Sequence, residues 1–249
     1  DLTEATSTYT LQVLGKTLFG IDTEAHRSAV RAGAEAIRHR SSQNPLSVDL
    51  PDWLPTPSNR RYKRGVAQLE SVVDDLIAKT EPDSNQDDIL SMLVTAGERK
   101  ENGPTEREIR SQLMTFLFAG HETSATALTW ALYELGRKPE VADRLYSEVD
   151  DVVDGPTATL ADIPELEFTE QVLEETLRRY PPAAAIFREA DEEVTIGGYR
   201  VPADTFVVLP QFHVHTDERW WSDPERFDPS RWDDISELPG NRPEYSYFP

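Results

Sequence analysis

The chain has 249 residues, and its 46 acidic and 25 basic residues give a formal net charge of −21 and a pI near 4.6. So acidic a chain is a poor partner for nucleic acid or for an anionic membrane surface. No apolar run approaches the roughly 18 residues of a membrane-spanning helix. The absence of cysteine excludes disulfides, thiol nucleophiles and thiolate ligands from these residues.

Lysine is scarce: only five of the 25 basic residues are lysines, at positions 16, 63, 79, 100 and 138. An acidic surplus with so little lysine suggests the cytoplasm of a salt-adapted, halophilic microbe, where high ionic strength screens self-repulsion. An ordinary acidic protein is the alternative interpretation.

Most of the chain shows the pattern of helices, because apolar residues recur at intervals of three and four between Pro- and Gly-containing breaks. Helices are predicted at residues 3–20, 23–40, 59–79, 86–97, 105–137, 139–153 and 168–180. A β pattern appears only after them. The segment EVTIGGYRV predicts two short strands around a tight turn at Gly197-Gly198, and residues 205–209 predict another strand. The remaining residues form an irregular Pro- and Trp-rich coil, so the fold class is mainly α with a small β region.

The longest predicted helix, residues 105–137, carries a polar run where core residues are expected. Thr105 and Glu108 form a capping-box pattern at its start, and its length is roughly 50 Å. In the run AGHETSAT, the sequence HETSA invites comparison with the zinc motif H-E-x-x-H. The second histidine of that motif is replaced by Ala125, so the zinc-protease interpretation fails.

A second pattern is ETLRRYPP, in which Glu175 and Arg178 lie three residues apart on one helix face. For an isolated E-x-x-R sequence, a solvated surface pair is the better interpretation. Here the motif is followed by Pro181-Pro182, a predicted hairpin and the sequence FDPSRW.

These motifs, taken together and in this order, resemble the cytochrome P450 family of haem-thiolate monooxygenases. The resemblance rests on AGHETS, ETLR, the hairpin region GGYRVPADTFVVLPQFHVHTDERWW and FDPSRW, and it extends over nearly the whole chain. It implies a cytochrome P450 fold, present as one partial domain over residues 1–249.

The resemblance assigns the polar run of the long helix to oxygen activation on haem b. Ala119 and Gly120 are then small because the helix passes over the haem and leaves room for O2. Thr123 donates its hydroxyl to the carbonyl of Ala119, which opens a local kink. Thr123 and Glu122 organise proton delivery to the bound oxygen. The alternative is a threonine satisfied by its own helix beside a solvated glutamate.

By the same resemblance, Glu175 and Arg178 join Arg231 in a buried structural charge triad. Arg231 is chosen over Arg226 because it is the arginine of F-x-P-x-R-W. Arg188 matches the arginine that binds a haem propionate in the family, and an ordinary surface arginine on a strand is the alternative. Residues 183–186 are expected to line the pocket of an apolar substrate.

The chain departs from the family at its defining ligand, because the cysteine that binds the haem iron is missing. The loop that carries it is expected directly after Pro249, and we expect the chain to be a fragment that lacks this loop and the N-terminal helices. These residues alone are therefore expected to form no haem-thiolate site and to be inactive.

The expected function of the whole protein is insertion of one oxygen atom from O2 into an apolar organic substrate. Its electrons would come from a ferredoxin- or flavodoxin-type partner. The second interpretation is a haem-free remnant or binding scaffold of the same fold, and a helical metal hydrolase is a third that lacks ligands. A measurement of haem binding by the full-length protein distinguishes the monooxygenase from the haem-free scaffold.

Overall fold

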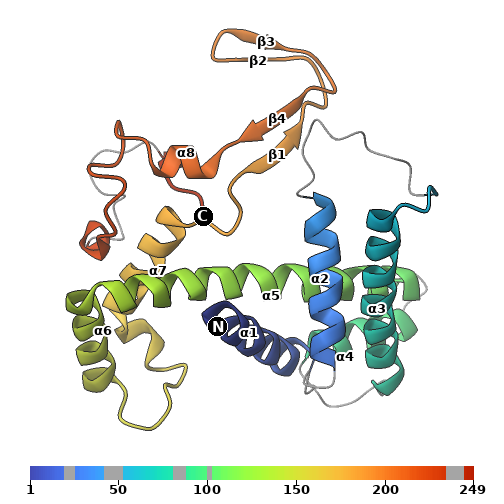
Figure 1. Ribbon diagram of the computed structural model, residues 1–249, viewed down its shortest axis with the longest axis horizontal. Coiled ribbons are helices and arrows are strands. Elements are labelled where there is room, and N and C mark those ends of the chain that lie inside the picture. The colour runs from blue at the N-terminus through green and yellow to red at the C-terminus, as the bar shows by residue number, and fades with distance from the viewer. Residues whose placement is uncertain (20–25, 42–52, 81–87, 100–102, 234–243) are drawn as a thin grey trace. The chain divides into compact units, whose positions relative to one another are not determined.

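The computed structural model describes residues 1–19, 26–41, 53–80, 88–99, 103–233 and 244–249. The chain divides into two compact units, Asp1–Ala125 and Thr126–Pro249, and the boundary falls within the long helix α5 (Glu106–Arg137). Figure 1 shows this helix as the longest element of the chain. The single partial domain expected over residues 1–249 stays a prediction.

The first unit is entirely helical in its described residues, as the apolar spacing predicts. Its helices are α1 (Leu2–Leu18), α2 (Arg27–Ser41), α3 (Pro57–Lys79), α4 (Ile89–Arg99) and the first part of α5. Their predicted bounds agree to within one or two residues where they can be compared. The starts predicted at residues 23 and 86 lie outside the described residues.

The start of α5 has the capping box that the sequence predicts. Glu108 Oε2 accepts hydrogen bonds from the backbone N–H of Thr105 at 2.7 Å and from its hydroxyl at 2.8 Å. In return, the backbone N–H of Glu108 donates to the Thr105 hydroxyl at 3.3 Å. The bond from the Thr105 N–H is the main reason why the pKa of Glu108 is lowered. These bonds satisfy donors that the first turn of a helix otherwise leaves free.

The core of the first unit joins all five of its helices. It consists of Leu11, Leu14, Phe19, Val30, Leu69, Val72, Val73, Leu76, Leu90, Val94, Ile109, Leu113 and Leu117. Helices α2 and α3 approach closely at Gly65, where an added Cβ would lie 2.4 Å from the Cβ of Ala36. Only glycine fits this contact without a shift of the helices.

The second unit contains the end of α5, then α6 (Pro139–Val152) and α7 (Glu167–Arg179). The start of α7 is capped from α6, because the Glu148 carboxylate accepts the backbone N–H groups of Phe168 and Thr169 at 2.5 and 2.8 Å. It also accepts the Thr169 hydroxyl at 2.7 Å. A carboxylate at a helix N-terminus is favoured both by the free N–H groups and by the helix dipole.

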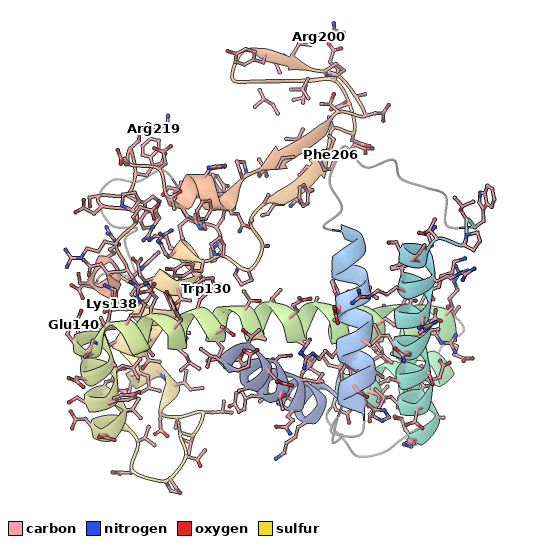
Figure 2. All side chains as sticks on the ribbon, in the orientation of Figure 1. Trp130, Lys138, Glu140, Arg200, Phe206 and Arg219 are labelled. Carbon is pink, nitrogen blue, oxygen red and sulfur yellow. The ribbon has the colours of Figure 1, made fainter. Side chains whose placement is uncertain are left out.

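Two small antiparallel sheets follow α7. The predicted hairpin is confirmed: β2 (Val194–Ile196) pairs with β3 (Tyr199–Val201), and Gly197 and Gly198 have φ values of 57° and 85°. Two successive positive φ angles are typical of a type I′ turn, which glycine adopts without strain. The predicted strand at 205–209 is β4 (Phe206–Leu209), and its partner is β1 (Ile186–Glu189), which the sequence analysis did not predict as a strand. Figure 2 labels Arg200 on the hairpin and Phe206 on β4.

The rest of the second unit is a short helix and an irregular coil. Helix α8 (Gln211–His215) follows β4, and the 3-10 turns η3 (Pro229–Trp232) and η4 (Glu244–Ser246) interrupt the coil. Phe168, Val172 and Phe227 form a small buried core between α7 and the coil. Within the described ranges, no helix is both long and apolar enough to cross a bilayer.

Candidate functional site

The polar run of α5 places Thr123 and Ala119 on an exposed face of the helix. The hydroxyl of Thr123 donates a hydrogen bond of 2.7 Å to the carbonyl of Ala119, one turn earlier. This is the bond that the sequence analysis expects. A second donor on a helical carbonyl weakens the regular backbone bond there. The helix nevertheless runs without interruption from Glu106 to Arg137, and the local kink stays a prediction.

Gly120 packs against α1. A Cβ at this position would lie 2.8 Å from Cδ1 of Leu14, so a larger residue here would require the Leu14 side chain to shift. The space for O2 that the family resemblance gives to Gly120 stays a prediction. Glu122, between Gly120 and Thr123 along the helix, is half-buried.

His121 is the residue of this run that the sequence analysis left without a role. Its side chain is only 4% exposed, and its Nε2 shares a hydrogen bond of 2.8 Å with the hydroxyl of Ser7 on α1. The carbonyl of His121 accepts a bond of 3.2 Å from the hydroxyl of Thr10. Burial lowers the pKa of His121 and outweighs the opposing charge of Glu122. The missed signal is the helical spacing of His121 from the core residue Leu117.

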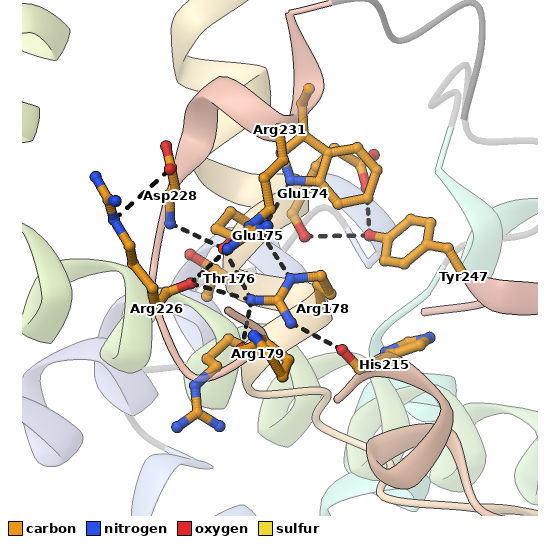
Figure 3. Close-up of polar contacts among 12 residues, drawn as sticks. Glu174, Glu175, Thr176, Arg178, Arg179, His215, Arg226, Asp228, Arg231 and Tyr247 are labelled. Carbon is orange, nitrogen blue, oxygen red and sulfur yellow. Dashed lines mark hydrogen bonds and ion pairs between the residues drawn. The ribbon is translucent and has the colours of Figure 1, made fainter. Parts of the chain in front are cut away.

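In the second unit, Glu175 and Arg178 of α7 form a fully buried ion pair (Figure 3). The pairing is bidentate: Nε of Arg178 donates to Oε2 of Glu175 at 2.8 Å and Nη2 donates to Oε1 at 2.9 Å. Arg178 also donates to three carbonyls beyond α7, those of His215 at 2.8 Å, Pro224 at 2.9 Å and Arg226 at 3.3 Å. One guanidinium therefore ties α7 to two distant segments of the chain.

Glu175 is the centre of this cluster. Its carboxylate accepts Nε of Arg231 at 3.3 Å, the backbone N–H of Asp228 at 2.9 Å and Nε1 of Trp232 at 3.1 Å. The structure thus brings together Glu175, Arg178 and Arg231. Arg226, the arginine that the sequence analysis passed over, has a side chain that is 67% exposed and lies 3.7 Å from Asp228.

His215 joins the same cluster through its backbone and its ring. Its carbonyl accepts from Arg178, and its Nε2 accepts the backbone N–H of Phe248 at 3.1 Å. Burial and the adjacent Arg178 charge lower the pKa of His215 to about 4. The imidazole is therefore neutral near pH 7, with Nε2 free to accept and the proton on Nδ1.

We expect the protein to lose stability in acid through His215. Its pKa is about 4 in the folded chain and about 6.5 in an unfolded one, so between these values the unfolded chain binds the extra proton. The free energy of unfolding should fall as the pH falls from about 6.5 to about 4. Urea denaturation at several pH values measures this slope. His215→Gln should flatten it, and His213→Gln, which changes an exposed neighbour, should not. Equal slopes in both variants would contradict the assignment.

Arg188 lies on β1, opposite Val207 of β4, and its side chain is exposed. Its Nη1 donates to the carbonyl of Phe187 at 2.8 Å. Among the described residues this is the bond that the structure gives to the Arg188 side chain, so further N–H donors remain to bind an anionic group such as a carboxylate.

A cluster of positive charge lies beside Tyr180 and the end of α5 in the second unit. Four cations line a pocket of about 240 Å³, together with two carboxylates and two aromatic residues. The lining residues are Glu134, Arg137, Lys138, Arg179, Tyr180, Glu225, Arg226 and Phe227. Lys138 is labelled in Figure 2, near Trp130. The local excess of positive charge contrasts with the net charge of −21.

Comparison with known proteins identifies the family of this chain. The family model for cytochrome P450 matches residues 1–249, the whole chain. The chain belongs to the cytochrome P450 family. The mainly helical fold and the family resemblance expected from the sequence are thereby confirmed.

Individual relatives agree with this assignment. Cyclooctat-9-en-7-ol 5-monooxygenase of Streptomyces melanosporofaciens is 36% identical over 240 residues, which are 93% of this chain and 51% of that protein. Pentalenene oxygenase of Streptomyces avermitilis is 38% identical over 180 residues, which are 72% of this chain and 40% of that protein. This P450 chain spans about half the length of the curated relatives it matches.

Solved P450 structures have the same fold. The retinoic acid-bound cyanobacterial CYP120A1 matches with a TM-score of 0.80 and 23% identity, covering 98% of this chain and 54% of that one. The haem domain of cytochrome P450DA matches with a TM-score of 0.78 and 26% identity, covering 94% of this chain and 52% of that one.

Members of the P450 family use haem b, and the residues present fit it in part. The exposed Thr123 and Ala119 suit the oxygen side of a haem, and Arg188 has donors left for a propionate. The iron of a P450 is held by a cysteine thiolate, which none of these 249 residues can supply. The described residues also contain no group of three or more His, Cys, Asp or Glu side chains suited to a metal ion.

Proposed function

We propose that the whole protein is a haem-dependent monooxygenase that inserts one oxygen atom from O2 into an apolar organic substrate. The observation that carries the proposal is the Thr123 hydroxyl, held on an exposed face of α5 by the carbonyl of Ala119 in a chain that matches the P450 family throughout. When bound, haem supplies the activation of O2.

Thr123 and Glu122 would move the protons that the reaction consumes. The Thr123 hydroxyl gives its own proton to the carbonyl of Ala119, so its oxygen lone pairs are left to accept a hydrogen bond from water or substrate. Glu122 is half-buried one residue earlier and can supply protons from its carboxyl group.

Arg188 would bind a haem propionate through the N–H groups that remain after its bond to Phe187. Glu175, Arg178 and Arg231 would have a structural role. They fix the coil that ends at Pro249, since Arg178 holds the carbonyl of His215 and His215 holds Phe248. In this proposal the coil presents the segment that carries the thiolate ligand.

The substrate is proposed to be a mainly hydrocarbon molecule. Two of the relatives are named for oxygenation of pentalenene and of cyclooctat-9-en-7-ol. The small residues Ala183, Ala184 and Ala185 and the adjacent Ile186 agree with an apolar ligand, as the sequence analysis expects. Pentalenene and cyclooctat-9-en-7-ol are therefore the first compounds to test.

Electrons are proposed to come from a ferredoxin- or flavodoxin-type protein. The net charge of −21 would repel an acidic donor at low ionic strength. The cationic pocket around Lys138 supports docking by local charge complementarity. The acidic composition also supports a cytoplasmic location in a salt-adapted microbe, where this repulsion is screened.

An isotope experiment on the full-length protein tests this function. The purified protein is supplied with ¹⁸O2, a reductase, either ferredoxin or flavodoxin, and each candidate substrate, at low and at molar KCl. The proposal predicts a product with one ¹⁸O atom, formed only with an electron donor, and salt adaptation predicts that activity persists in molar KCl. A full-length protein that binds no haem would instead support the haem-free scaffold, and loss of activity in molar KCl would contradict salt adaptation.

A further inference from the structure

Helix α1 contacts Gly120 and His121, in the polar run of α5, through two hydroxyl residues and a leucine. Ser7, Thr10 and Leu14 lie on one face of α1, spaced by three and four residues. Leu14 lies against Gly120, while Ser7 and Thr10 bond to the ring and the carbonyl of His121. All of these residues belong to the first unit.

His121 and Thr123 lie on opposite sides of α5. Two residues along an α-helix correspond to a rotation of roughly 200°, because each turn contains 3.6 residues. His121 is buried against α1, whereas Thr123 is exposed. A rotation of α5 that moved His121 away from Ser7 would turn the Thr123 hydroxyl by the same angle.

The polar contact between α1 and His121 favours one rotation of α5 about its axis. An apolar side chain in place of His121 could pack against α1 at several neighbouring rotations, since the hydrophobic effect is non-directional. Hydrogen bonds of 2.8 and 3.2 Å fix distance and direction together. Burial of an imidazole is less favourable than burial of an apolar side chain. The advantage of the histidine is therefore that its hydrogen bonds fix the orientation of α5 against α1.

Two carbonyls of this short segment accept side-chain hydroxyls in addition to their helical partners. The carbonyl of Ala119 accepts from Thr123, and the carbonyl of His121 accepts from Thr10. Hydroxyl bonds of this kind weaken the backbone bonds of a helix locally. Residues 119–123, which the proposed reaction uses, therefore depend on contacts from α1 to keep their geometry.

We propose that His121, held by Ser7 and Thr10 of α1, is a positioning residue that sets the orientation of the turn from Ala119 to Thr123. His121 acts through the helix and contacts neither substrate nor haem in this proposal. The proposal rests on the proposed monooxygenase function for its consequence, but its structural part stands on the contacts of α1 with α5.

The test compares two isosteric substitutions on α1. Thr10→Val removes a hydroxyl whose proton is shared between the carbonyls of His121 at 3.2 Å and Ser7 at 3.3 Å, while Thr17→Val removes an exposed bond to the carbonyl of Val13 within α1 itself. Amide hydrogen exchange is followed in the full-length protein. Thr10→Val should speed exchange of the amides of residues 119–125 by about fivefold, which corresponds to one lost hydrogen bond of about 1 kcal/mol. Thr17→Val should leave them unchanged, and equal exchange in the two variants would overturn the proposal.

A second pair of variants and a second readout separate positioning from simple stability. His121→Gln keeps a polar group that can reach Ser7 and should exchange like the parent protein, whereas His121→Leu should behave like Thr10→Val. In the haem-loaded protein, the ratio of oxygenated product to hydrogen peroxide should fall severalfold in Thr10→Val, with an unchanged KM for substrate. Faster exchange with an unchanged ratio would overturn the positioning role. A parent protein without oxygenation would contradict the proposed function, and the exchange data alone would then decide whether α1 orders this turn.

Discussion

Replacing Arg178 by leucine should lower the free energy of unfolding by about 3–5 kcal/mol, because it leaves the Glu175 carboxylate buried without its main counter-charge. It also removes the donors to the carbonyls of His215 and Pro224. Urea denaturation of the full-length protein measures the change. Arg226→Leu is the matched control, since that side chain is exposed, and it should change stability by less than about 0.5 kcal/mol.

A further variant keeps the result interpretable if Arg178→Leu fails to fold. The triple substitution of Glu175, Arg178 and Arg231 by leucine removes all three charges of the cluster and should be more stable than Arg178→Leu alone, because no uncompensated buried charge remains. If Arg178→Leu were as stable as Arg226→Leu, the buried pair would not be what holds the coil to α7.

Replacing Thr123 by valine should lower the rate of product formation by about a hundredfold, the lower end of what a positioned proton-transfer group contributes. The substitution is isosteric on an exposed helix face, so the substrate KM and the stability should change little. Turnover with substrate and electron donor, together with hydrogen peroxide release, provides the measurement.

Thr115 offers a matched control on the same helix. It is exposed, and its hydroxyl donates to the carbonyl of Ser111 at 2.9 Å, with the same four-residue spacing as the bond from Thr123 to Ala119. Thr115→Val should keep full activity, and Thr123→Ser, which restores a hydroxyl, should recover much of the loss. Equal activity in the two valine variants would remove Thr123 from the proposed proton path.

The helices and the hairpin could be predicted because their signals are local in the sequence. Apolar spacing marks α5, the pair Thr105 and Glu108 marks its start, and Gly197-Gly198 marks the turn between β2 and β3. Strand β1 was missed because its partner is β4, which follows the whole hairpin, so nothing near residues 186–189 indicates the pairing. Helix α8 is only five residues long and gives too short a pattern to detect.

In the candidate site, too, local patterns could be predicted from the sequence and contacts between distant residues could not. The i, i+3 spacing and the family motif were enough to select Glu175, Arg178 and Arg231. The carbonyls that Arg178 binds lie 37, 46 and 48 residues further along the chain and could not be foreseen. The partner of His121 is 114 residues away on α1, so its burial and its bond to Ser7 appear only in three dimensions.

The carbon monoxide spectrum of the reduced full-length protein tests the central claim most directly. A haem-thiolate monooxygenase predicts stoichiometric haem and the Soret band that is typical of carbon monoxide on thiolate-bound iron. Absence of haem, or a band typical of histidine-bound iron, would contradict the account and leave a P450 fold without P450 chemistry.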